Sequence, residues 1–199
     1  AYDIMPSLVG SEMCIRDSLY FMDIDLTPDQ LVDFSAWVKR NRSKANTVPR
    51  HCLVFTHRTL QTPMQFRECL WGRYNDSAAE QQNIFYRNLR DAGVRFVVTG
   101  HLHAHDLYMI TSPDGQNTLT SLICAPAGNK VLPIPFLLPA KSRVKTLQYR
   151  SGITAYYILT IYPDSMTLDT YAAPNNGTTD EGPQSGEFNK LNSYAIPMD

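Results

Sequence analysis

Residues 94–105 read VRFVVTGHLHAH, and this stretch decides the fold. Its first half is rich in β-branched and aromatic residues, and its second half alternates histidines after a glycine. A short, largely apolar run that ends in a turn signal is typical of a strand buried on both faces, as in a parallel sheet. We therefore predict a buried strand over VRFVVTG, residues 94–100, with histidines just beyond its carboxyl end.

The segment before this strand predicts a helix. Ser77 and Glu80 have the spacing of a capping box, and Gly93 is well placed to end the helix. The apolar residues of its buried face are Ile84, Phe85, Leu89 and Ala92.

The same alternation continues towards the N-terminus. HCLVFTH, residues 51–57, is a second buried strand, and a helix precedes it. Thr27 and Gln30 form that helix's capping box, and residues 18–25 form a further strand. The order strand, helix, strand, helix, strand is the signature of α/β units.

After the histidines the pattern changes. Strand-like runs such as AYYILTIY and SMTLDTY follow one another with turn signals and no helix between them, which predicts antiparallel neighbours. Residues 174–199 are polar and rich in Gly and Pro at their start, and predict a flexible tail.

Composition excludes some classes of partner. The chain has 199 residues, 43% of them hydrophobic, and a net charge of −1, which fits one domain of ordinary size. Nothing indicates nucleic-acid binding, and no apolar run is long enough to span a membrane. The four cysteines show no metal-ligand spacing, and the compartment and the oligomeric state stay open.

The N-terminal segment stands apart from the rest. SLVGSEMCIRDS, residues 7–18, resembles translated sequencing-adaptor sequence. We expect residues 1–18 to be non-native, the alternative being a genuine N-terminal arm.

The histidines group by position. His57 ends one buried strand, and His101 and His103 follow another, so parallel pairing would bring them to one rim of the sheet. In extended backbone, alternate residues point the same way, so His101 and His103 can converge. The alternative is that they are surface loop histidines. His105 continues the alternation but needs no special role, and His51 lies at the opposite end of its strand.

At these residues the chain resembles a known family. Val54-x-x-His57 and Gly100-His101-Leu102-His103 resemble the last two metal motifs of the calcineurin-like metallophosphoesterases, in the form seen in purple-acid-phosphatase-like members. LTPDQLVDFSAWV resembles the helix before them. The resemblance covers residues 19–171. It implies the C-terminal half of an αββα sandwich with mixed sheets, as a partial domain over residues 19–173.

The resemblance also implies a chemistry. His57 and His101 would be ligands of one divalent ion and His103 a ligand of its neighbour, in a two-metal hydrolysis of phosphomonoesters or phosphodiesters. Imidazole suits manganese, iron, zinc or nickel, so the metals are not distinguished. Arg58 and His105 are candidates to contact a phosphoester substrate. No residue is assigned as catalytic.

The family's remaining ligands are not in this sequence. Its D-x-H, G-D and G-N-H motifs do not occur, and a ligand role for Asp23 or Asp25 is disfavoured. We therefore expect a fragment of a metal-dependent phosphoesterase that is inactive as the isolated chain. The alternative is a non-catalytic binding module that retains the fold and holds at most one metal.

Overall fold

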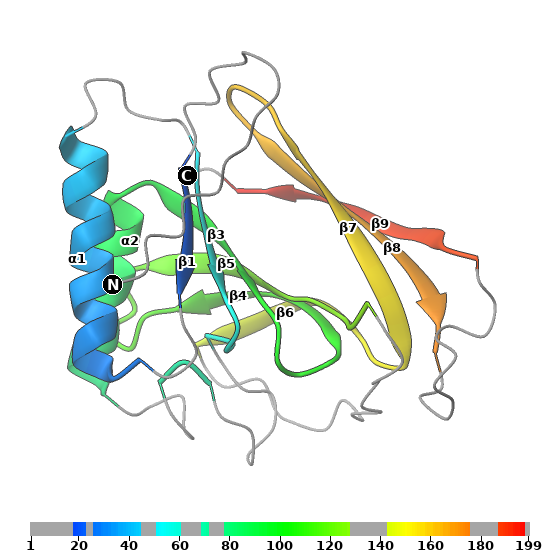
Figure 1. Ribbon diagram of the computed structural model, residues 1–199, viewed down its shortest axis with the longest axis horizontal. Helices are drawn as coiled ribbons and strands as arrows, with labels where there is room; N and C mark the ends of the chain where they lie inside the picture. The colour runs from blue at the N-terminus through cyan, green and yellow to red at the C-terminus, as the bar shows by residue number, and fades with distance from the viewer. Residues whose placement is uncertain are drawn as a thin grey trace.

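The computed structural model describes residues 18–22, 26–44, 51–60, 69–71, 78–127, 143–175 and 187–197. Within these ranges the chain forms two sheets and a pair of helices (Figure 1). The elements are β1 Ser18–Met22, α1 Pro28–Lys44, β2 Cys52–Thr56, α2 Ala79–Asp91, β3 Val94–Thr99, β4 His105–Thr111, β5 Thr118–Ile123, β6 Val144–Arg150, β7 Ile153–Ile161, β8 Met166–Pro174 and β9 Asn189–Ile196.

The larger sheet is mixed. Its strand order is β1-β2-β3-β5-β4-β6, and β1, β2, β3 and β5 run parallel to one another. β4 is antiparallel to both β5 and β6, and β7-β8-β9 form a separate antiparallel sheet. The predicted α/β class with mixed sheets is confirmed. The antiparallel neighbours predicted after the histidines are found in both sheets, except that β5 also pairs parallel with β3.

The start of α1 is the one that the sequence predicts. The Gln30 backbone N–H donates to Thr27 Oγ1 at 3.3 Å, and the Thr27 N–H donates to Gln30 Oε1 at 2.8 Å. Leu26 packs against the core that contains the buried Leu31. This reciprocal cap is worth about 1 kcal/mol, and it fixes where the helix begins.

α2 ends as predicted but begins differently. Ala78 is its N-cap, in the left-handed conformation at φ 52°, and makes no side-chain capping bond. The predicted cap at Ser77 is therefore wrong, and Ser77 itself lies outside the described residues. Gly93 ends the helix at φ 82° and donates to the Arg90 carbonyl at 2.9 Å. On the predicted face, Phe85, Leu89 and Ala92 are buried, whereas Ile84 is half-buried.

Helices, large sheet and small sheet form three layers. Figure 1 shows α1 and α2 on one face of the large sheet and β7-β8-β9 on the other. Val54 packs in the core under the helices, and Leu53 packs in the core between the sheets, where it meets Leu168 of β8. Both faces of β2 are therefore buried. Among the described residues no helix covers the outer face of the small sheet.

β9 lies in the stretch for which the sequence predicts a flexible tail. It pairs with β8 along its length, and Ile196 is buried between the sheets. The prediction is wrong for Asn189–Ile196. It rests on the polar composition of residues 174–188, and it overlooks the short apolar pattern that follows them. Asp23, Asp25 and residues 1–17 lie outside the described residues, although Ser18 belongs to β1 and pairs with Cys52.

The two helices are too short or too polar to cross a membrane, as far as the described residues go.

Candidate functional site

Two histidines meet at the carboxyl ends of β2 and β3. Thr56 and Thr99, the last residues of these parallel strands, are paired. One step beyond them the Gly100 backbone N–H donates to the His57 carbonyl at 3.1 Å, so the pairing continues into the turn. A side chain at Gly100 would lie 3.7 Å from that carbonyl, which is ordinary contact. The sequence prediction that parallel strands bring these residues together is confirmed for His57 and His101.

The two rings face one another through their nitrogens. His57 Nε2 lies 3.1 Å from His101 Nδ1, with ring centroids 5.1 Å apart and ring planes at 72°. His57 is exposed and His101 is half-buried. Two imidazole nitrogens that each lie about 2.1 Å from one metal ion are roughly 3.0–3.4 Å apart for right-angled to tetrahedral ligands. The observed separation is that of a hydrogen bond between the two rings, with the donor set by the tautomers, and it also fits a pair of neighbouring ligands on a single ion.

The backbone of the histidine loop is not extended. His101 has φ 71° and His103 has φ 52°, and Leu102 N–H donates to the Gly100 carbonyl at 2.9 Å. The prediction that His101 and His103 point the same way as alternate residues of an extended chain is therefore wrong. Left-handed backbone costs a non-glycine residue about 1–2 kcal/mol. The fold maintains it because Leu102 and Ala104 are buried.

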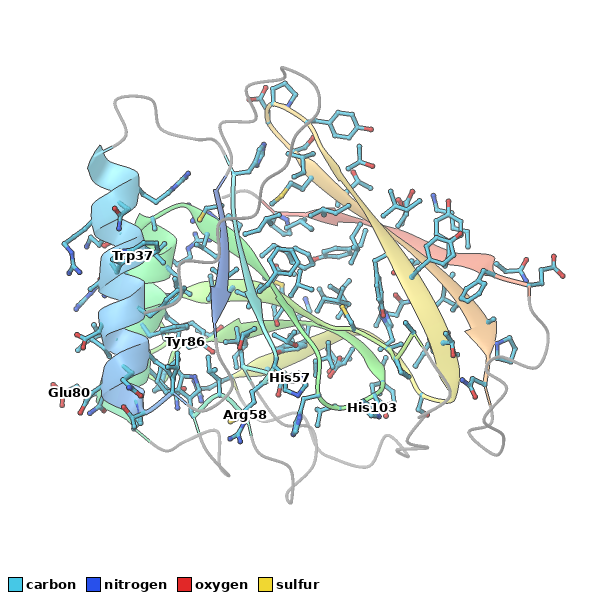
Figure 2. All side chains as sticks on the ribbon, in the orientation of Figure 1. Trp37, His57, Arg58, Glu80, Tyr86 and His103 are labelled. Atoms are coloured by element: carbon cyan, nitrogen blue, oxygen red, sulfur yellow. The ribbon has the colours of Figure 1, made fainter. Side chains whose placement is uncertain are left out.

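His103 lies on the same edge of the molecule but does not complete a cluster. Figure 2 shows His57, Arg58 and His103 along the lower edge, at the ends of the strands. Within the described residues, no three His, Cys, Asp or Glu side chains are close enough to hold a metal ion together. The described part of the chain thus provides one two-nitrogen arrangement, with His103 beside it.

Arg58 follows His57 at this edge and is half-buried. Its predicted contact with substrate stays a prediction.

His105 has a different environment from the one the sequence suggests. It begins β4, is 0% exposed and stacks on Tyr157 of β7 with ring centroids 5.7 Å apart. Its Nε2 donates to Gln148 Oε1 at 3.0 Å, and its Nδ1 accepts from the Tyr157 hydroxyl at 3.1 Å. The same hydroxyl oxygen accepts from the Ala125 N–H at 2.9 Å.

The proposed substrate contact of His105 is therefore corrected. Both ring nitrogens have partners inside the protein, and burial lowers the pKa of the ring to about 4, so it is neutral at physiological pH. His105 joins the large sheet to the small one.

His51 lies at the other end of β2, as predicted. It is buried, and its Nε2 donates to the Tyr162 carbonyl at 2.5 Å. It is structural and remote from the histidine pair.

The sequence analysis did not identify Asp106 as a special residue. Asp106 is 2% exposed at the start of β4, and burial raises its carboxyl pKa to about 7. By alternation along β4 it faces the helix layer with Tyr108, whereas His105 and Leu107 face the small sheet. The sequence does contain a signal for this residue: Asp106 is a charged residue near the start of a mainly apolar strand, directly after the histidine loop.

Comparison with known proteins leaves the family open. No protein-family model matches the chain, and no curated protein matches it. One similar solved structure is titled "GAP50 the anchor in the inner membrane complex of Plasmodium". It is 13% identical, at a TM-score of 0.44 over 88% of this chain and 49% of that one.

A second solved structure, titled "Structure of PhoD", is 10% identical, at a TM-score of 0.44 over 82% of this chain and 35% of that one. The chain thus spans less than half the length of each. Likenesses of this size establish neither a shared fold nor a shared activity.

Proposed function

We propose that the chain is part of a metal-dependent phosphoesterase and supplies one side of its metal centre. In this proposal His57 and His101 hold one divalent ion, and His103 is a ligand of its neighbour. The substrate is a phosphomonoester or a phosphodiester, and manganese, iron, zinc and nickel all suit the imidazole ligands.

The observation that supports the proposal is the 3.1 Å between His57 Nε2 and His101 Nδ1. The pair lies at the carboxyl ends of adjacent parallel strands, where α/β proteins bind ligands. Left-handed backbone at His101 and His103 adds to it, because strained residues concentrate at functional sites.

Each residue has a distinct task in this centre. A pair of divalent ions would polarise the phosphoryl oxygens and supply a hydroxide nucleophile. The histidines position the ions through nitrogens whose separation is set by the Gly100–His57 backbone bond. The Arg58 guanidinium orients a phosphoryl group through paired N–H donors.

The carboxylates of such a centre are missing from the described cluster, and the chain contains no D-x-H, G-D or G-N-H motif. Neutral imidazoles alone leave the charge of two dications poorly compensated. We therefore expect no turnover of aryl phosphomonoesters or phosphodiesters by the chain with added manganese or zinc. Measurable turnover that is lost on chelation would contradict the incomplete centre.

Metal binding tests the proposal without reference to activity. Isothermal titration of the chain with zinc should give a site at the histidine pair, which weakens at least about tenfold in His57→Ala and in His101→Ala, since each removes one of two ligands. The double variant should lose less affinity than the sum of the two single losses, because two residues that share one ion are not additive. Additive losses would mean that the two rings do not share an ion.

The alternative is a non-catalytic module that holds at most one metal. It is favoured by the fact that only two of the candidate ligands converge in the described structure. Stoichiometry separates the two functions. If His103 holds a neighbouring ion, titration shows a second, weaker zinc site that His103→Ala removes, whereas the single-metal module gives one site that His103→Ala leaves unchanged.

A further inference from the structure

β7 is a free edge of the small sheet. The strand order β7-β8-β9 leaves one side of β7 without a partner strand among the described residues. β7 has nine residues, ITAYYILTI, and none of them is charged. Unpaired edges of this length readily accept another strand, and natural proteins protect them with charged side chains, above all lysine.

Of the three other described edge strands, β6 and β9 carry that protection, whereas β1, with the sequence SLYFM, contains no charged residue. β6 contains Lys145 and Arg150, and β9 contains Lys190. β7 has instead most of the exposed large apolar side chains found in the described residues. These are Tyr156, Ile158, Ile161 and, one residue beyond the strand, Tyr162, and their exposed fractions run from 38% to 52%.

The sequence of β7 is self-complementary. If two copies of the strand pair antiparallel with their Tyr157 residues opposite one another, Ile153 lies opposite Ile161 and Thr154 lies opposite Thr160. The inner pairs are Ala155 with Leu159 and Tyr156 with Ile158. We infer that β7 pairs antiparallel with β7 of a second copy of this chain, about a two-fold axis at Tyr157.

The two-fold axis makes a second copy the occupant that the strand fits best. An isologous interface must present the same patch on both subunits, and only a strand with matched halves pairs well with itself. Each cross-strand pair then joins apolar with apolar or threonine with threonine, and no like charges meet.

The paired strands would also cover exposed surface. Tyr156 and Ile158, at 45% and 46% exposed, lie on the outer face, where Tyr156 stacks on Tyr171 at 4.9 Å and contacts Phe188. In the dimer each Tyr156 ring packs beside Ile158 of the other copy. The result is a continuous six-stranded antiparallel sheet formed from two three-stranded ones. This inference is independent of the metal centre.

Charge reversal tests the register. Ile158→Lys is tolerated within one copy, because residue 158 faces Asp169 in β8. In Tyr156→Lys/Ile158→Lys, lysines oppose one another twice across the axis, whereas Tyr156→Glu/Ile158→Lys places glutamate opposite lysine twice. Trp37→Lys is the control, because it removes an equally exposed apolar side chain from α1, far from this edge.

Sedimentation velocity of the full chain over a concentration series is the measurement, with circular dichroism to show that each variant folds. We expect the parent, Trp37→Lys and the Glu/Lys variant to dimerise, and the Lys/Lys variant to have a dissociation constant at least about tenfold higher than the Glu/Lys variant. A parent that stays monomeric, open aggregates, or dimers that ignore the two charge patterns would each overturn the inference.

Discussion

His101 and His105 lie four residues apart and have opposite environments. His101 is half-buried in a bend, at positive φ, with a nitrogen 3.1 Å from that of His57. His105 is fully buried in a strand, and both of its nitrogens are bonded to side chains of other strands. The difference teaches that one sequence pattern, alternating histidines, can place one ring at an accessible strand end and the next but one between two sheets, with both nitrogens hydrogen-bonded.

The largest expected effect is on the buried histidine. His105→Ala removes two hydrogen bonds and the stack on Tyr157. The Tyr157 O–H loses its acceptor, whereas its oxygen keeps the Ala125 N–H and Gln148 Oε1 keeps the Asn192 side chain as donors. We expect the free energy of unfolding to fall by about 3–4 kcal/mol, measured by urea denaturation. His105→Gln, which keeps a polar side chain, should lose less. Equal losses in both would mean that ring packing alone matters.

The next effect concerns pH and the neighbouring Asp106. Its folded pKa of about 7 lies above the unfolded value of 3.8, so the folded state keeps the proton to a higher pH than the unfolded state does. The stability that this proton contributes is present at low pH and is lost as pH rises through 7. Asp106→Asn removes this dependence. Relative to the parent, the variant should therefore gain about 2–3 kcal/mol between pH 5 and pH 8.

Urea denaturation of both proteins at each pH measures this gain, and the difference between them removes the contribution of His105. A constant difference across this range would show that the Asp106 carboxyl is protonated to the same extent in the folded and unfolded states, so that burial does not raise its pKa.

A smaller effect of opposite sign is expected in the histidine loop. Glycine adopts φ 71° without the steric cost that His101 carries, so His101→Gly should raise the unfolding free energy by about 0.5–1 kcal/mol. The same substitution should weaken zinc binding. A destabilised variant would show that the imidazole contributes packing that exceeds the backbone strain.

The smallest effect is expected at His57. This side chain is exposed, and His57→Ala should change the unfolding free energy by less than about 0.5 kcal/mol while it weakens zinc binding. Thermal unfolding with and without zinc measures both. If the metal-free variant unfolds much more easily, His57 would belong with His105 as a structural residue.

Local rules predicted much of this structure. The capping box of Thr27 and Gln30, the turn at Gly93 and the buried parallel strands all follow from contacts within a few residues or from apolar patterns. They also placed His57 and His101 at one rim, because strand ends in a parallel sheet coincide.

What failed depends on the rest of the chain. The burial of His105 is decided by Tyr157 and Gln148, more than forty residues away. The left-handed backbone at His101 and His103 is maintained by the burial of Leu102, which no local propensity reveals. β9 forms because β8 offers an edge and the core between the sheets accepts Ile196.

The histidine loop is anchored at both ends, and this limits how the protein can change. At one end Gly100 is bonded to the His57 carbonyl, and at the other His105 is fixed between the sheets. The four residues between these anchors must connect two fixed points. Substitutions there alter a side chain, but an insertion of one residue would change the span itself. We therefore expect this loop to tolerate substitutions better than changes in its number of residues.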